Sequence, residues 1–122
     1  MKLGDLTDAV VGRAIEVHRR LGPGLRASTY EAALALELGE AGLRLERQVS
    51  LPILYKGRAV GVHPVDLVVE DALAVDIRTT EPPDPSTQSP ILQALRAARR
   101  KAWLLMNFGR PSLADGLFRF IL

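Results

Sequence analysis

The stretch HPVDLVVEDALAVDIRTT, residues 63–80, decides the fold. Two runs rich in valine and leucine flank the polar pair Glu70-Asp71, and each run contains one aspartate, Asp66 or Asp76. Apolar runs of this length around a short polar break predict a β-hairpin. If the turn centres on Asp71, the two aspartates face each other with Cβ atoms roughly 5 Å apart. Carboxylates that close repel unless solvent or a cation relieves them, so a functional site is expected here first.

Length and composition are those of one ordinary domain. The chain has 122 residues, of which 48% are hydrophobic and 25% charged, and this predicts a single globular domain over residues 1–122. Cysteine is absent and the only histidines are His18 and His63, which argues against a zinc site. No run approaches the ~20 apolar residues of a membrane span, and the N-terminus lacks the pattern of a secretory signal. We therefore expect a cytoplasmic protein without a membrane partner.

Charge is unevenly distributed along the chain. Residues 1–87 hold 10 basic and 13 acidic side chains, whereas residues 88–122 hold 6 basic and 1 acidic. A basic C-terminal third beside an acidic centre suits a phosphate backbone, so Arg99, Arg100 and Lys101 are candidate nucleic-acid contacts. The same cations would also suit the C-terminal end of a helix, where they favour the dipole. Both interpretations stay open at this point.

The remaining pattern predicts two helices followed by strands. Apolar residues at helical spacing predict a helix that ends near Leu21, before Gly22-Pro23-Gly24. Ser28 as N-cap, with Glu31 as its capping-box partner, predicts a second helix that ends near Gly42. Further along, the patterns predict strands over 43–53, 59–69 and 73–79, a helix near 91–98 after a proline-rich loop, and strands over 102–108 and 117–122.

This order of elements predicts an α/β fold, more closely an α+β domain with a mixed sheet. It has two N-terminal helices, a three-stranded antiparallel meander, a crossover helix, and one or two further strands. Because a helix crosses between the strands at 73–79 and 102–108, those two strands should be parallel.

The order, with one acid in the first hairpin strand and an acid-x-base sequence in the second, resembles the restriction-endonuclease-like PD-(D/E)XK nuclease superfamily. Within it, the chain is similar to the bacterial GxxExxY family. The segments that carry the resemblance are AIEVHRRLGPGL (14–25), Tyr30-Glu31, ERQVSLPILYKG (46–57), VDLVVED (65–71) and LLMNFG (104–109).

The resemblance implies a metal-dependent phosphodiesterase site on the hairpin. Asp66 and Asp76 would be the metal ligands and catalytic acids, and their oxygens suit Mg²⁺ or Mn²⁺. At the family's lysine position, which orients or activates the attacking water, this chain has Arg78. Arginine keeps its charge and can hold a phosphate oxygen, but it cannot lose a proton and act as a base.

Further positions depart from the family pattern. The glutamate that names the family falls at Ala27, and its helix glutamine and tyrosine fall at Pro90 and Ala94. Trp103 stands where the family usually has a small residue. The resemblance therefore implies a degenerate site in which metal binding is weak or absent. Glu16 on the first helix either replaces the lost acid or pairs with arginines at helical spacing.

Three functions remain consistent with the sequence. One is an active nuclease in which Asp66 and Asp76 hold the metal and Arg78 binds the phosphate. Another is a non-catalytic DNA or RNA binder, whose affinity would fall with salt. The third is an interaction module, a homodimer, with partner contacts at Trp103 and residues 117–122. We favour a nuclease-like protein with a degenerate, catalytically impaired site that binds nucleic acid.

Overall fold

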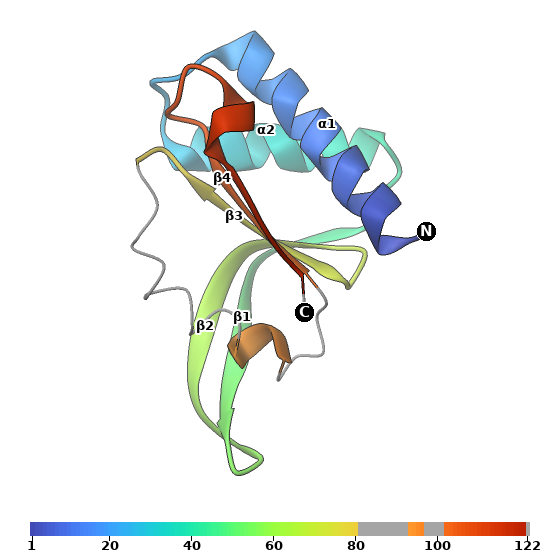
Figure 1. The fold of residues 1–122 in the computed structure, drawn as a ribbon, viewed down its shortest axis with the longest axis vertical. Helices are drawn as coiled ribbons and strands as arrows, with labels where there is room; N and C mark the ends of the chain where they lie inside the picture. The colour runs from blue at the N-terminus through green and yellow to red at the C-terminus, as the bar shows by residue number, and fades with distance from the viewer. Residues whose placement is uncertain (81–92, 97–101, 122) are drawn as a thin grey trace.

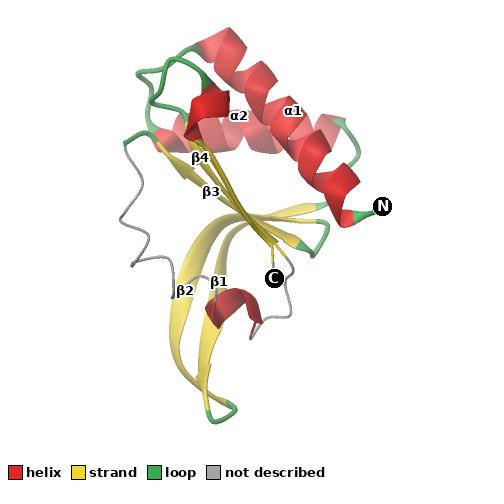
Figure 2. Cartoon of the chain, in the orientation of Figure 1, coloured by secondary structure: helices red, strands yellow, loops and turns green. Residues whose placement is uncertain are grey.

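The computed structural model describes residues 1–80, 93–96 and 102–121 (Figure 1; Figure 2). Residues 93–96 are helical, within the helix expected near 91–98. The other elements, in chain order, are α1 (Leu3–Leu21), α2 (Ala27–Glu40), β1 (Leu45–Tyr55), β2 (Arg58–Val69), β3 (Leu73–Arg78), β4 (Ala102–Asn107), the 3-10 turn η2 (Leu113–Gly116) and β5 (Leu117–Ile121).

All five strands belong to one sheet, in the order β1-β2-β3-β4-β5. The pairs β1–β2, β2–β3 and β4–β5 are antiparallel, whereas β3–β4 is parallel. A parallel pair requires the chain to cross from one end of the sheet to the other between the two strands. The mixed sheet, the antiparallel meander and both C-terminal strands confirm the predicted α+β fold.

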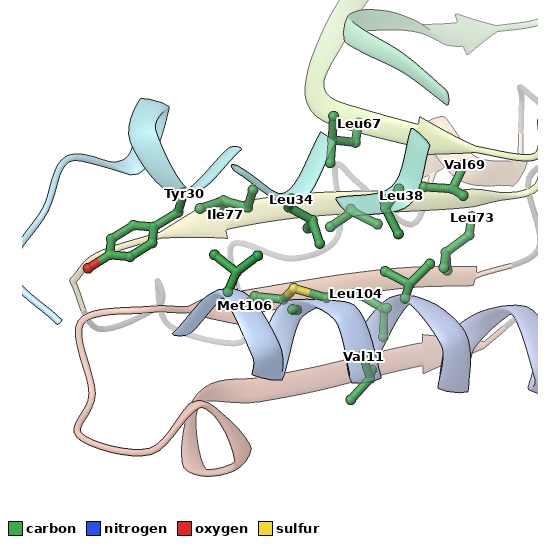
Figure 3. Close-up of a cluster of buried hydrophobic side chains, with 14 of the residues drawn as sticks. Val11, Tyr30, Leu34, Leu38, Leu67, Val69, Leu73, Ile77, Leu104 and Met106 are labelled. Atoms are coloured by element: carbon green, nitrogen blue, oxygen red, sulfur yellow. The ribbon is translucent and has the colours of Figure 1, made fainter. Parts of the chain in front are cut away.

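The main core lies between the sheet and the two helices, which cover the same face (Figure 1). Side chains alternate along a strand, so Leu73, Val75 and Ile77 of β3 all face these helices. Figure 3 shows Leu73 and Ile77 on the side of the sheet that faces Leu34 and Leu38 of α2. Full burial of one such side chain stabilises the fold by about 2 kcal/mol.

A smaller core covers the opposite face. Ala94 and Leu95 pack there against side chains from four strands, and Ala94 is fully buried. Trp103 of β4 belongs to this second core and is only 4% exposed. The hypothesis that Trp103 is a surface contact for a partner is therefore wrong for this conformation.

The ends of α2 differ in how well the sequence predicts them. Gly42 has φ 79, its N–H donates to Gly39 O, and Leu43 N donates to Leu38 O, which is the predicted glycine C-cap in a Schellman arrangement. The predicted capping box at the other end is wrong. The helix begins at Ala27, after an Arg26 cap without a side-chain hydrogen bond, so Ser28 lies inside the helix.

The turn between α1 and α2 is held by one tyrosine. The Tyr30 hydroxyl donates to Gly22 O at 2.5 Å and accepts from Leu25 N at 3.1 Å. Its fully buried ring stacks on Phe108 with centroids 4.6 Å apart. Tyr30 is thus a core residue whose hydroxyl lies at the edge, as predicted.

Across the described residues, we find no helix with the length and apolar content to span a bilayer.

Candidate functional site

The hairpin between β2 and β3 brings Asp66 and Asp76 together. Ala72 N donates to Val69 O at 3.0 Å, and Glu70 and Asp71 have φ 51 and 55, as the two centre residues of a type I′ turn require. The register pairs residues 69, 68 and 67 with 73, 74 and 75. The next residues in this register are the two aspartates, which therefore face each other as predicted.

The two aspartates meet where the ladder between β2 and β3 stops. The last ladder pair is Leu67 with Val75. Beyond it, Asp66 N donates to Asp76 Oδ1 at 3.0 Å, and Ile77 N donates to Asp66 Oδ2 at 2.8 Å. Each carboxylate accepts a backbone N–H from the opposite strand. The pair therefore caps the point at which β2 diverges from β3.

Asp76 is the buried member of the pair, with 1% of its surface exposed. Its Oδ2 accepts a hydrogen bond of 2.9 Å from Trp103 Nε1. Trp103 reaches it because β4 runs parallel to β3, with Trp103 paired to Ala74, and its ring stacks on Phe120 at 4.9 Å. Burial raises the pKa of Asp76, and the nearby charge of Asp66 adds to this, against the hydrogen bonds it accepts and the charge of Arg78.

Gln48 links the aspartate pair to helix α2. The register places it opposite Asp66, but the pair is missing from the ladder because Gln48 has φ 54. Its Nε2 donates to Glu31 Oε1 at 2.7 Å and to Asp66 Oδ1 at 3.3 Å. A non-glycine residue in this left-handed region costs about 1–3 kcal/mol and persists only where its surroundings hold it. Here one amide group bridges two carboxylates.

Glu31 is the helix acid beside this site. It is 7% exposed, and Arg47 Nε and Nη2 both lie 3.0 Å from its Oε2. Sequence reasoning missed this role because the S-x-x-E pattern assigned Glu31 to a capping box. A usable signal existed, since Glu31 lies four residues after Ala27 and so on the same face of the helix.

Glu16 lies elsewhere and pairs with arginines of its own helix. Its carboxylate is 2.9 Å from Arg19 Nη2 and 2.6 Å from Arg20 Nε. The hydrogen bond from Arg20 lowers the pKa of Glu16. Of the two alternatives for Glu16, the structure supports the helical ion pairs.

Arg78 stands at the exposed rim of the site. Its Nη1 lies 3.6 Å from Asp66 Oδ2 and donates to Ile77 O at 3.0 Å. The side chain is 40% exposed, compared with 23% for Asp66. A partly exposed cation thus lies next to the more accessible aspartate.

The chain matches a known protein family over nearly its whole length. A model described as the PD-(D/E)XK nuclease superfamily matches residues 4–120. The chain belongs to the PD-(D/E)XK nuclease superfamily. A search of curated proteins and a search of solved structures each found no match.

PD-(D/E)XK nucleases generally use Mg²⁺ or Mn²⁺, so the side chains must be tested against such an ion. Within the described ranges, no three carboxylate, imidazole or thiol groups gather to hold a metal. A magnesium ion needs accessible oxygens in near-octahedral geometry with room for its waters. Asp76 is covered by Trp103, and both of its oxygens already accept protein N–H groups. As arranged, the two aspartates do not fit a shared PD-(D/E)XK metal site.

The remaining positions singled out in the sequence include four that the structure does not describe and one histidine that it does. Arg99, Arg100, Lys101 and Pro90 lie outside the described residues, so the nucleic-acid role of the three cations stays a prediction. His18 is structural in the described part, because its Nε2 lies 2.8 Å from the carbonyl oxygen of Arg110.

Proposed function

We propose that this protein is a PD-(D/E)XK nuclease-like domain of the GxxExxY type whose active site is degenerate. It binds DNA or RNA without cleaving it at an appreciable rate. The single observation that carries the proposal is the hydrogen bond from Trp103 Nε1 to the buried carboxylate of Asp76.

The GxxExxY assignment rests on sequence segments supported by their placement in the fold. Gly24 and Tyr30 keep the motif spacing, and the Tyr30 hydroxyl closes the turn that contains Gly24. The motif glutamate is replaced by Ala27 at the start of α2. The scaffold half of the motif is thus retained and its acid is lost.

Impaired catalysis follows from what phosphodiester hydrolysis demands. The metal must contact accessible carboxylate oxygens so that it can activate water and stabilise the leaving oxygen. Asp76 instead accepts hydrogen bonds from Asp66 N and Trp103 Nε1. A metal ion could bind these carboxylate oxygens only if it broke hydrogen bonds that hold the strands together. Arg78 cannot replace the general base, because a guanidinium does not deprotonate in proteins.

Binding without cleavage is supported by the cation that remains at the rim. Arg78 is 40% exposed, and arginine donors match the geometry of phosphate oxygens. Arg47, which is 48% exposed, adds a second cation on the neighbouring strand β1. Phosphate contacts of this kind give an affinity that falls steeply with salt.

The active alternative, with Asp66 and Asp76 on a metal and Arg78 on the phosphate, keeps one favourable observation. Asp66 is 23% exposed beside Arg78, so one ligand oxygen and one phosphate contact are accessible together. A homodimeric interaction module is the other alternative, since Ile121 on edge strand β5 is 71% exposed.

A cleavage assay tests the proposal directly. Supercoiled plasmid and labelled single-stranded RNA are incubated with the protein in MgCl₂ or MnCl₂, beside Asp66→Asn as the matched control. We expect cleavage no faster than in the control, and titration calorimetry with MnCl₂ to give no heat above that of Asp76→Ala. Metal-dependent cleavage that disappears in Asp66→Asn would establish the active nuclease instead.

A further inference from the structure

The hairpin of β1 and β2 continues beyond the rest of the sheet as a two-stranded arm (Figure 1). Within the part of the chain that the structure describes, β3 pairs with residues 67–69 of β2, and residues 58–66 have no ladder partner on that side. Residues 54–62 are all exposed, and they include the apolar side chains Leu54, Val60 and Val62. Residues 54–62 contribute no side chain to either described core, so the side chains at this end of the arm are accessible to a partner.

Charge on the arm has one sign. Residues 54–62, the exposed end of the arm, contain no acid, yet they contain Lys56 and Arg58. Lys56 Nζ lies 5.5 Å from the ring centroid of Tyr55, which is 63% exposed. An arm that is basic and apolar with an aromatic ring near its end matches an anionic partner.

The tip of the arm is a tight turn, and Lys56 and Arg58 lie at its end. Tyr55 pairs with Arg58, so Lys56 and Gly57 form a two-residue turn, with φ 50 and 77 as in a type I′ turn. Exposed apolar residues lie behind the tip, at 54, 60 and 62. This order disfavours insertion into a membrane, where Lys56 and Arg58 would enter the hydrocarbon ahead of Leu54, Val60 and Val62.

The dimensions of the arm match a nucleic-acid groove. The arm is a two-stranded ribbon whose strands lie about 4.8 Å apart, and its exposed end comprises residues 54–62. The major groove of B-DNA is about 12 Å wide and 8.5 Å deep, and it admits a two-stranded β-ribbon. We infer that the β1–β2 arm binds duplex DNA by entering the major groove, with Lys56 and Arg58 on phosphates. This inference rests on the proposed nucleic-acid binding and names the element responsible for it.

A fluorescence-anisotropy titration with a fluorescein-labelled duplex of about 20 base pairs, in EDTA and over a salt series, tests the inference. The first variant is Lys56→Gln with Arg58→Gln. Its control, Arg19→Gln with Arg20→Gln, removes the same charge from α1, where both side chains are 74% exposed. We expect the arm variant to bind about tenfold to sixtyfold more weakly at 0.1 M salt, and its log–log salt slope to fall by about 2. The control should bind nearly as the unmodified protein does.

A second variant replaces residues 54–60 with Asn-Gly and keeps the pair Ile53 with Gly61 as the end of the hairpin. Because every deleted residue is exposed, circular dichroism and thermal melting should be unchanged while duplex binding is lost. If the unmodified protein binds duplex and both arm variants bind equally well, the arm inference is overturned and the proposed function stands. If the unmodified protein binds no duplex at low salt, the arm inference fails, and the same titration with labelled single-stranded RNA decides whether the proposed nucleic-acid binding fails with it. Arm-dependent binding to phosphatidylserine vesicles without duplex binding would overturn the inference in favour of a membrane.

Discussion

Trp103 and Asp76 lie on adjacent parallel strands, and the indole Nε1 donates a 2.9 Å hydrogen bond to the carboxylate Oδ2 of Asp76. The bond joins Trp103 of the second core to one of the two aspartates that the sequence resemblance predicted as metal ligands. The same contact covers the carboxylate and satisfies it. A site arranged in this way stabilises the sheet at the expense of ligand access.

Removal of the indole N–H should destabilise the protein in a pH-dependent manner. Trp103→Phe keeps a ring for Phe120 but leaves Asp76 Oδ2 without its donor. A hydrogen bond to a charged group contributes about 1.5–3 kcal/mol, so urea denaturation at pH 7 should show a loss of stability of about that size. The cost should shrink at acidic pH, where Asp76 is protonated. Phe120→Leu is the control, with a loss that is the same at both pH values; an equal pH profile for the two variants would contradict the prediction.

The raised pKa of Asp76 predicts the direction in which the free energy of unfolding changes with pH. Burial raises its pKa above the ordinary value of 3.8, so in the window between the two values the folded state holds a proton that the unfolded state has released. Stability contributed by this group is present below 3.8 and falls as pH rises through the raised pKa. Asp76→Asn fixes a neutral side chain at any pH, although its NH₂ group opposes one of the two donors.

The measurement is the free energy of unfolding of both proteins from pH 3.5 to 7.5. We expect the stability of the unmodified protein relative to Asp76→Asn to decline as pH rises. The constant penalty of the amide shifts the whole curve without changing this slope. A relative stability that increases with pH would mean that the pKa of Asp76 is lowered, and would contradict the burial argument.

The positive φ of Gln48 predicts that glycine is tolerated better than alanine at this position. Gly is ordinarily worse than Ala within a strand, by about 0.5–1 kcal/mol. At Gln48, φ is 54, which glycine adopts at no steric cost, while both substitutions lose the amide bridge to Glu31 and Asp66. Gln48→Gly should therefore be more stable than Gln48→Ala by about 1 kcal/mol in chemical denaturation. The usual order, with alanine more stable, would show that the strained φ is not a property of the folded chain.

Glu31 should matter more than a comparable acid on the outer face of its helix. Glu31→Gln weakens the pair with Arg47 and the bond from Gln48 at a position only 7% exposed, so we expect a loss of about 1–3 kcal/mol. Glu37→Gln is the matched control, because Glu37 pairs with Arg13 at 3.2 Å and is more exposed. Exposed pairs contribute about 0–1 kcal/mol. Equal losses in thermal melting would refute a special role for Glu31.

Sequence periodicity predicted the fold because each strand and helix buries one face, and the short polar turn fixed the register of the two aspartates. The contact between Trp103 and Asp76 was beyond such reasoning, since it depends on the register of two parallel strands 27 residues apart. Glu31 was misassigned for a different reason. The S-x-x-E pattern at residues 28–31 predicted that Glu31 caps its helix, but in the fold Glu31 pairs with Arg47 of strand β1.

If the lost groups alone silenced the site, their restoration should create a metal-dependent nuclease. Ala27→Glu with Arg78→Lys returns an acid to α2 and an amine to the end of β3. This double variant should remain inactive, because Trp103 still donates to Asp76 and covers it. Adding Trp103→Ala frees one oxygen of Asp76, and this triple variant should cleave supercoiled plasmid in MnCl₂.

The matched control is the triple variant with Asp66→Asn, which removes the more exposed acid and should be silent. Circular dichroism must show that each variant is folded, since Trp103 belongs to the second core. Activity already in the double variant would refute the role assigned to Trp103, because it would show that Asp76 accepts a metal with the indole in place. A folded but silent triple variant would mean that the groups at positions 90 and 94 are also required, and that the loss of catalysis is more extensive than the covering of one carboxylate.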